Sequence, residues 1–99
     1  MAPPSIVLLV RFKSPLTLEE AKEISESRLP QFRELTGLEQ KYYLHDVNSG
    51  EYAGLYLWDS KEALDEFRQS ELRATIASAY KVEGEPRVEV YGVTNVLRD

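Results

Sequence analysis

The segment from Leu38 to Trp58 is predicted to form a β-hairpin in which both faces are apolar. Asn48-Ser49-Gly50 is a turn signal between two strand-like runs. Side chains alternate between the two faces of a strand, so the second run divides into two chemically different sets. One face is aliphatic and carries Ala53, Leu55 and Leu57, whereas the other is largely aromatic and carries Tyr52, Gly54, Tyr56 and Trp58.

The length of the turn decides which residues of the first strand join each face. A loop of two or four residues pairs positions whose numbers sum to an odd number. In that register the aliphatic face gains Tyr42 and Leu44, and the aromatic face gains Lys41, Tyr43 and His45. A three-residue loop with Gly50 in a β-bulge would reverse the assignment.

Two apolar faces are more than a chain of 99 residues can cover by itself. Four free aromatic side chains at roughly 150 Å² each would expose about 600 Å², which is more than a soluble monomer usually leaves open. These four are Tyr43, Tyr52, Tyr56 and Trp58. We therefore expect helices on one face and a partner on the aromatic face, most simply a second copy of the chain in a homodimer with twofold symmetry.

The first half of the chain supplies a strand and a helix. Ser5–Phe12 is a continuous apolar run that predicts a buried central strand, with Arg11 as its one charge. Thr17–Glu20 has the pattern of a capping box that starts a helix. Pro30 predicts a kink or break in that helix, and Gly37 is its expected stop.

The second half repeats the pattern in reverse order. Asp59 and Ser60 can cap a second helix, which continues or restarts between Leu72 and Tyr80. Gly84-Glu85-Pro86 predicts a loop, and Arg87–Val93 alternates as a last strand. The expected fold is one α+β domain over residues 1–99, with ferredoxin-like βαββαβ order and two helices on one face of a four-stranded antiparallel sheet.

The composition excludes several function classes. Twelve basic against seventeen acidic residues leave a net charge of −5, which argues against a nucleic-acid surface, and no basic amphipathic segment favours a membrane. The amino-terminal residues lack the pattern of a signal peptide, so a cytoplasmic location is expected. The absence of cysteine excludes disulfides, thiolate chemistry and sulfur-ligated metals.

Three segments carry a resemblance to a known family: Leu35–Leu44, Tyr52–Ser60 and the helix with Ala63 and Phe67. Together they resemble the dimeric α+β barrel superfamily, and within it small candidate mono-oxygenases akin to antibiotic-biosynthesis monooxygenases. The resemblance implies two sheets that face each other across a homodimer. The superfamily also includes haem-degrading members. They resemble this chain at Trp58 but use a histidine in the following helix. Residues 60–80 contain no histidine, so we reject a haem site.

His45 is the candidate catalytic residue. It is the only histidine of the chain and can exchange protons near neutral pH. A cofactor-independent oxygenase needs a base that ionises a phenol or enol before oxygen reacts. The register places His45 beside Tyr43 and across from Tyr52 and Gly54, among aromatic surfaces, and Gly54 would leave room there. The alternative is a strand-end histidine, half in water, without a catalytic role.

The candidate substrate-binding residues are Tyr43, Tyr56, Trp58 and Arg11. The tyrosines can hydrogen-bond or stack on a substrate, or serve an interface. Trp58 can form a stacking wall, or a plug between the strand end and the second helix. Arg11 can bind a substrate carboxylate, or pair with Glu89 on the last strand, which we favour. No metal site or cofactor is indicated.

Three functions are compatible with these expectations. The first is a cofactor-independent monooxygenase-like protein that acts on a small aromatic or polyketide-like substrate. The second is a non-catalytic dimer that binds a small hydrophobic molecule or serves a stress response. The third is a purely structural interaction module. They differ in whether an enclosed cavity exists and whether His45 points into it.

Overall fold

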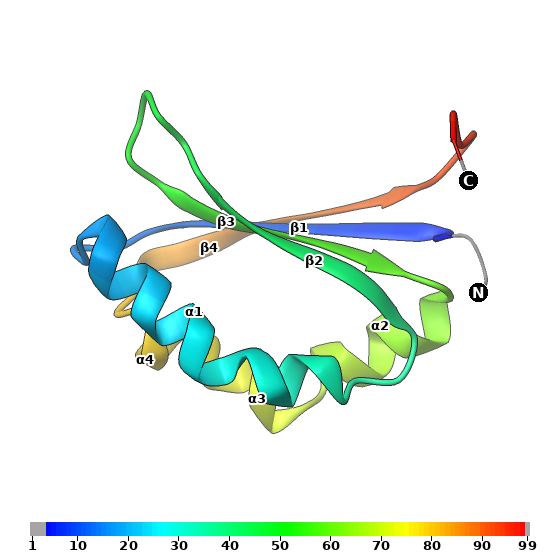
Figure 1. Ribbon diagram of the computed structural model, residues 1–99, viewed down its shortest axis with the longest axis horizontal. Coiled ribbons are helices and arrows are strands. Elements are labelled where there is room, and N and C mark those ends of the chain that lie inside the picture. The colour runs from blue at the N-terminus through cyan, green and yellow to red at the C-terminus, as the bar shows by residue number, and fades with distance from the viewer. Residues whose placement is uncertain (1–3, 99) are drawn as a thin grey trace.

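The computed structural model describes residues 4–98 and shows one four-stranded sheet with helices on one side (Figure 1). The elements in chain order are β1 (Ile6–Lys13), α1 (Leu18–Arg33), β2 (Leu38–His45), β3 (Tyr52–Trp58), α2 (Lys61–Arg68), α3 (Glu71–Ala74), α4 (Ile76–Ala79) and β4 (Glu83–Gly92). Every neighbouring pair of strands is antiparallel, and the spatial order is β2-β3-β1-β4. The predicted fold class is confirmed.

The β2–β3 hairpin has the predicted register, in which the numbers of two opposed residues add up to an odd number. Tyr43 lies opposite Gly54, and His45 lies opposite Tyr52. The loop closes where the Asp46 N–H donates to the Glu51 carbonyl at 2.8 Å, which leaves four residues in the turn. A bulge near the start of β2 shifts the pairing by one residue without moving His45 or Tyr43 to the other face.

The aromatic face of the hairpin lies beneath the chain's own helices. Tyr52, Tyr56 and Trp58 are only 7%, 2% and 0% exposed in the single chain. The helices add Phe32 and Phe67 to the same cluster of rings. The prediction that this face meets a partner subunit is therefore wrong. Alternation defines two faces, but the side that the crossover helices cover follows from the handedness of the β–α–β connections.

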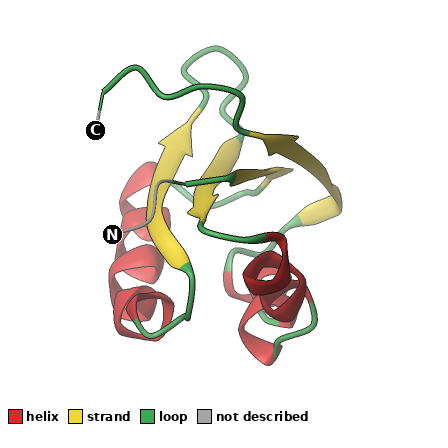
Figure 2. Cartoon of the chain, turned by 90° about the vertical axis from the view of Figure 1, so that its right-hand side faces the viewer, coloured by secondary structure: helices red, strands yellow, loops and turns green. Residues whose placement is uncertain are grey.

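The aliphatic face is the side of the sheet that no helix covers (Figure 2). The register places four aliphatic residues in its centre, Val7, Leu9, Leu55 and Leu57. Tyr42, Leu44 and Tyr91 flank them and are 51%, 43% and 50% exposed. We call this surface, made of these seven residues, the open face. It is the apolar surface that the helices leave uncovered.

Helix α1 begins as its sequence predicts. The Thr17 Oγ1 accepts from the Glu20 N–H at 3.2 Å, and the Glu20 carboxylate accepts from the Thr17 N–H at 2.8 Å, so the capping box is complete. The helix continues through Pro30 to Arg33, and the expected break is absent. Proline leaves the carbonyl four residues earlier without a donor, but that residue, Glu26, is exposed and water can bind there.

The second helical region and the last strand differ in detail from expectation. Ser60 caps α2 by accepting from the Ala63 N–H at 3.2 Å, and the helix restarts twice as α3 and α4. Strand β4 begins at Glu83, so the residues predicted as a loop, 84–86, belong to the strand. A shift in its pairing with β1 and a positive φ of 73° at Gly84 accommodate them.

Candidate functional site

A cavity of about 300 Å³ lies between α1, the edge strand β2 and the aromatic face of the sheet. Its apolar lining includes Val10 and Phe12 from β1 and Ile76 at the start of α4. Its polar lining combines three residues of α1 with six from the strands and the end of α4: Lys22, Ser25, Glu26, Lys41, Tyr43, His45, Tyr52, Tyr56 and Tyr80. The site is therefore an aromatic pocket inside a single chain, with two lysines, one glutamate and one histidine in its wall.

Three of the residues predicted from the sequence meet in this pocket. His45, Tyr43 and Tyr56 all line it. The His45 ring is exposed at the end of β2 and lies 5.1 Å from the Tyr52 ring, centroid to centroid. Gly54 also lines the pocket, and a Cβ there would lie only 3.0 Å from the Tyr56 ring. The space over the glycine is therefore occupied by the Tyr56 ring and the Lys41 side chain, and not by the open room for a ligand that the sequence predicted.

Trp58 lies outside the pocket, in the centre of the core. Its side chain is fully buried and parallel to the Tyr56 ring, with 6.2 Å between centroids, and it contacts Phe67 at 5.3 Å. Its indole N–H has no hydrogen-bond partner among the described residues. This position agrees with a structural role, as a plug between the strand end and the second helix. Trp58 does not form a stacking wall of the pocket.

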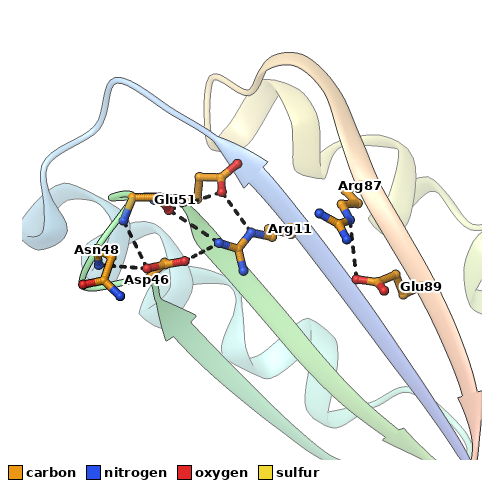
Figure 3. A network of polar contacts seen from close by, with 7 residues as sticks. Arg11, Asp46, Asn48, Glu51, Arg87 and Glu89 are labelled. Atoms are coloured by element: carbon orange, nitrogen blue, oxygen red, sulfur yellow. Dashed lines mark hydrogen bonds and ion pairs between the residues drawn. The ribbon is translucent and has the colours of Figure 1, made fainter.

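Arg11 lies on the other face of the sheet, near the hairpin loop (Figure 3). Its guanidinium forms ion pairs with Asp46 and Glu51, with 2.9 Å between Nε and the Glu51 Oε1. The Asp46 carboxylate also accepts from the N–H groups of Ser49 and Asn48, and these bonds with the Arg11 contact lower its pKa. Arg11 is therefore held by two protein carboxylates and does not face the pocket.

The predicted ion pair between Arg11 and Glu89 is wrong. In the β1–β4 register Glu89 lies opposite Leu9, and Arg11 lies opposite Arg87. Glu89 instead pairs with Arg87 at 3.6 Å and accepts from the Tyr91 hydroxyl at 2.6 Å. The register of two strands far apart in the chain decides which partners meet, and the sequence of either strand alone does not contain it.

Lys41 is the pocket residue that the sequence argument did not select. Its Nζ lies 3.6 Å from the centroid of the Phe32 ring, 4.2 Å from that of Tyr43 and 4.4 Å from that of Tyr56. We call these three rings the Lys41 cage. Burial, with a smaller contribution from the charge of Arg28, lowers the pKa of Lys41 to about 7. The signal was present in the register, which placed a lysine within a row of aromatic residues.

The tyrosines around the pocket keep their protons at neutral pH. Burial raises the pKa of Tyr80 to about 12 and raises the pKa of Tyr56 and of Tyr43 above the ordinary value. Their hydroxyls can therefore donate hydrogen bonds to a ligand oxygen. The pocket combines hydroxyl donors with two nitrogen bases, which suits a ligand that carries acidic oxygens.

The lowered pKa of Lys41 predicts that the protein becomes more stable between pH 7 and about 9. In that window the unfolded chain binds one more proton than the folded chain, so the free energy of unfolding rises with pH by up to about 1.4 kcal/mol per unit. For a chain of this size the melting temperature should rise by up to about 6–11 °C per unit. Thermal denaturation followed by circular dichroism measures it.

Two lysine variants separate this effect from other titrations. Lys41→Met should remove most of the slope, because its side chain carries no proton to lose. Lys61→Met changes an exposed lysine at the start of α2 and should keep the slope. An equal slope in wild type and Lys41→Met would show that another group causes the pH dependence.

Two further kinds of feature, a metal cluster and a membrane-spanning helix, are absent from residues 4–98. No three histidine, aspartate or glutamate side chains in that range gather closely enough to hold a metal ion. No helix in the same range is long and apolar enough to cross a membrane.

Comparison with solved structures gives close matches of fold at low sequence identity. SnoaB from Streptomyces nogalater, a cofactor-independent oxygenase, matches with a TM-score of 0.75 and 12% identity over 97% of this chain and 99% of its own. Rv0793 from Mycobacterium tuberculosis matches with a TM-score of 0.74 and 17% identity over 94% of this chain and 98% of its own. A candidate antibiotic biosynthesis monooxygenase from Caulobacter crescentus matches with a TM-score of 0.75 and 16% identity over 94% of this chain and 92% of its own.

No family model and no curated protein matches this sequence. The likeness therefore concerns the fold, and it extends over nearly the whole chain and nearly the whole of each similar structure. The chain has the α+β fold of the antibiotic-biosynthesis-monooxygenase-like proteins, and the resemblance predicted from the sequence is confirmed at the level of fold.

Proposed function

We propose that this protein is a cofactor-independent mono-oxygenase for a small planar aromatic or polyketide-like substrate. The observation that carries the proposal is the aromatic-lined pocket of about 300 Å³ with His45 in its wall. Pockets of this size hold small organic ligands, and rings on the walls favour a flat apolar molecule. SnoaB, which has the same fold, is described as a cofactor-independent oxygenase, and this supports the same reaction class here.

The proposed reaction needs no reductant other than the substrate. For an anthrone, a base removes one proton from the CH₂ group, and the resulting enolate transfers one electron to oxygen. The two radicals combine into a peroxide. Cleavage of its O–O bond leaves one oxygen as a new carbonyl and releases the other as water, with the two hydrogens of the original CH₂. His45 is the proposed base, and Tyr43 and Tyr56 orient the substrate by stacking or hydrogen bonds.

Oxygen uptake with anthrone as substrate tests the proposal. His45→Ala should lower the rate by about 10²-fold, the usual contribution of a positioned general base. His45 is exposed, so the variant should fold normally. Lys61→Met, far from the pocket, is the matched control and should keep the wild-type rate. Unchanged turnover in His45→Ala would remove His45 from the mechanism. Absence of uptake by the wild type would favour a binding protein that catalyses no reaction.

We also propose that the protein is a homodimer in which the open face of one sheet packs against that of a second copy. Leu9 and Leu55 lie opposite each other on adjacent central strands in the middle of this face, and tyrosines flank them. An apolar surface without a helix cover is suited to a self-complementary contact about a twofold axis, and the charged residues Arg11, Arg87 and Glu89 lie on the same face around its centre. In this arrangement each pocket stays within its own subunit, on the helix side of the sheet.

A further inference from the structure

We propose that Lys41 binds an ionised oxygen of the ligand, a phenolate or enolate oxygen, at the end of the pocket away from His45. This inference rests on the proposed function only in taking the same pocket as the ligand site. It names the class of molecule that the pocket accepts. That class is a planar aromatic compound with an acidic hydroxyl group at one end.

The neighbours of Lys41 hold its amine in one position. The side chain lies across Gly54, where a Cβ would come within 3.3 Å of the Lys41 Cε. The amine then lies inside the Lys41 cage, within 4.4 Å of all three ring centroids, and it lines the cavity. Ring faces attract a cation but supply no formal negative charge. The cage therefore positions the amine and leaves its charge without a counterion.

The charges around Lys41 also favour an anionic ligand. Lys41 forms no ion pair with any carboxylate among residues 4–98. Arg28, the next cation, donates to the Leu72 carbonyl at 3.1 Å and to the Thr75 hydroxyl at 3.0 Å, which are neutral acceptors. The two other charged residues in the lining, Lys22 and Glu26, are exposed residues of α1 with opposite charges. This end of the pocket is therefore positive, and an anionic oxygen is the group that it lacks.

The spacing along β2 indicates the size of the ligand. Lys41, Tyr43 and His45 lie on one face of the strand at every second position. Four residues of strand separate Lys41 from His45 by about 13 Å, so one oxygen atom cannot contact both. A flat molecule of two or three fused rings can place an acidic oxygen at Lys41 and its reacting carbon near His45. Tyr43 lies between these two residues along the strand, and its ring centroid is 4.2 Å from the Lys41 Nζ.

The proton balance is simple for this contact. A phenol that enters gives its O–H proton to the neutral amine of Lys41, and the product is an ammonium–phenolate pair with no net change in charge. Burial lowers the pKa of Lys41 to about 7, so a neutral amine is available near neutral pH. The new pair then forms in a site largely shielded from water, where a charge-assisted hydrogen bond is strong.

Binding of 4-nitrophenol tests the inference directly, because its phenolate is coloured and its phenol is not. Below the pKa of the free dye, wild type should bind it and shift its spectrum towards the phenolate. Lys41→Met, which keeps an unbranched side chain one atom shorter and removes the charge, should weaken binding at least tenfold and abolish the spectral shift. Lys41→Arg should retain part of both, and Lys61→Met should match the wild type.

Nitrobenzene, which lacks the hydroxyl group, is the matched probe for pocket shape. Its affinity should be the same for wild type and Lys41→Met. The proposal is overturned if Lys41→Met binds 4-nitrophenol as tightly as wild type, if nitrobenzene binding falls to the same extent, or if wild type binds no 4-nitrophenol. Binding that depends on Lys41 without oxygen uptake would sustain this inference and reject the oxygenase. Equal oxygen uptake by wild type and Lys41→Met would sustain the oxygenase and reject the role of Lys41 in binding.

Discussion

Leu55→Glu is expected to convert a homodimer into a monomer at micromolar concentration. Leu55 lies in the centre of the open face, opposite Leu9 on one side and Tyr42 on the other. In a symmetric contact each copy would bury one new carboxylate, and Arg11, a cation on the same face, is already paired with Asp46 and Glu51. Such a buried carboxylate costs about 3–5 kcal/mol, so the dissociation constant should rise by about 10³-fold or more.

Sedimentation velocity measures the change, since the mass of one chain is 11.4 kDa and a dimer has twice that value. The side chain of Leu55 points away from the chain's own core, so the variant should keep the wild-type circular dichroism spectrum. Ala74→Glu adds the same charge at an exposed position of α3 and should remain a dimer. A wild-type protein that sediments as a monomer would reject the proposed contact, and so would a Leu55→Glu variant that remains a dimer.

Trp58→Ala is expected to lower the free energy of unfolding by about 3–5 kcal/mol, a large part of the stability of a domain of this size. The indole is fully buried against the rings of Tyr56 and Phe67, so its removal leaves a cavity that rigid neighbours cannot fill. Its N–H has no hydrogen-bond partner within residues 4–98, so the expected loss is one of packing. Urea denaturation of the two proteins measures the difference.

Trp58→Phe separates the structural role of this residue from a role in ligand binding. Phenylalanine keeps most of the buried ring and should cost less stability than alanine. Because Trp58 does not line the pocket, the affinity of the folded variant for nitrobenzene should equal that of the wild type. A marked loss of affinity in a stable Trp58→Phe variant would restore the stacking-wall interpretation. A loss of stability below about 1 kcal/mol in Trp58→Ala would contradict the packing argument.

Local sequence signals predicted the elements and the hairpin register well. The capping box at Thr17 and the cap at Ser60 start helices where the pattern places them. The four-residue turn pairs His45 with Tyr52, as an odd sum requires. These features depend on contacts between residues close in the chain, and such contacts can be derived from spacing and side-chain chemistry.

The candidate site was predicted in part. His45, Tyr43 and Tyr56 meet in the pocket because they share one face of one hairpin, and the sequence contains that information. Lys41 belongs to the same row but becomes prominent only when Phe32 from α1 completes its cage. Its pKa depends on that distant helix, since burial cannot be derived from the neighbouring residues in the chain.

The sequence by itself determined that the sheet has one aliphatic and one aromatic face, because strand alternation follows from backbone geometry. Only the tertiary structure decided that the helices cover the aromatic face, that Arg11 meets Asp46 and Glu51 and not Glu89, and that Trp58 is enclosed in the core. These outcomes depend on the hand of the crossovers and on the registers between distant strands. Both are set by the packing of the whole chain, which minimises exposed apolar surface across all elements at once.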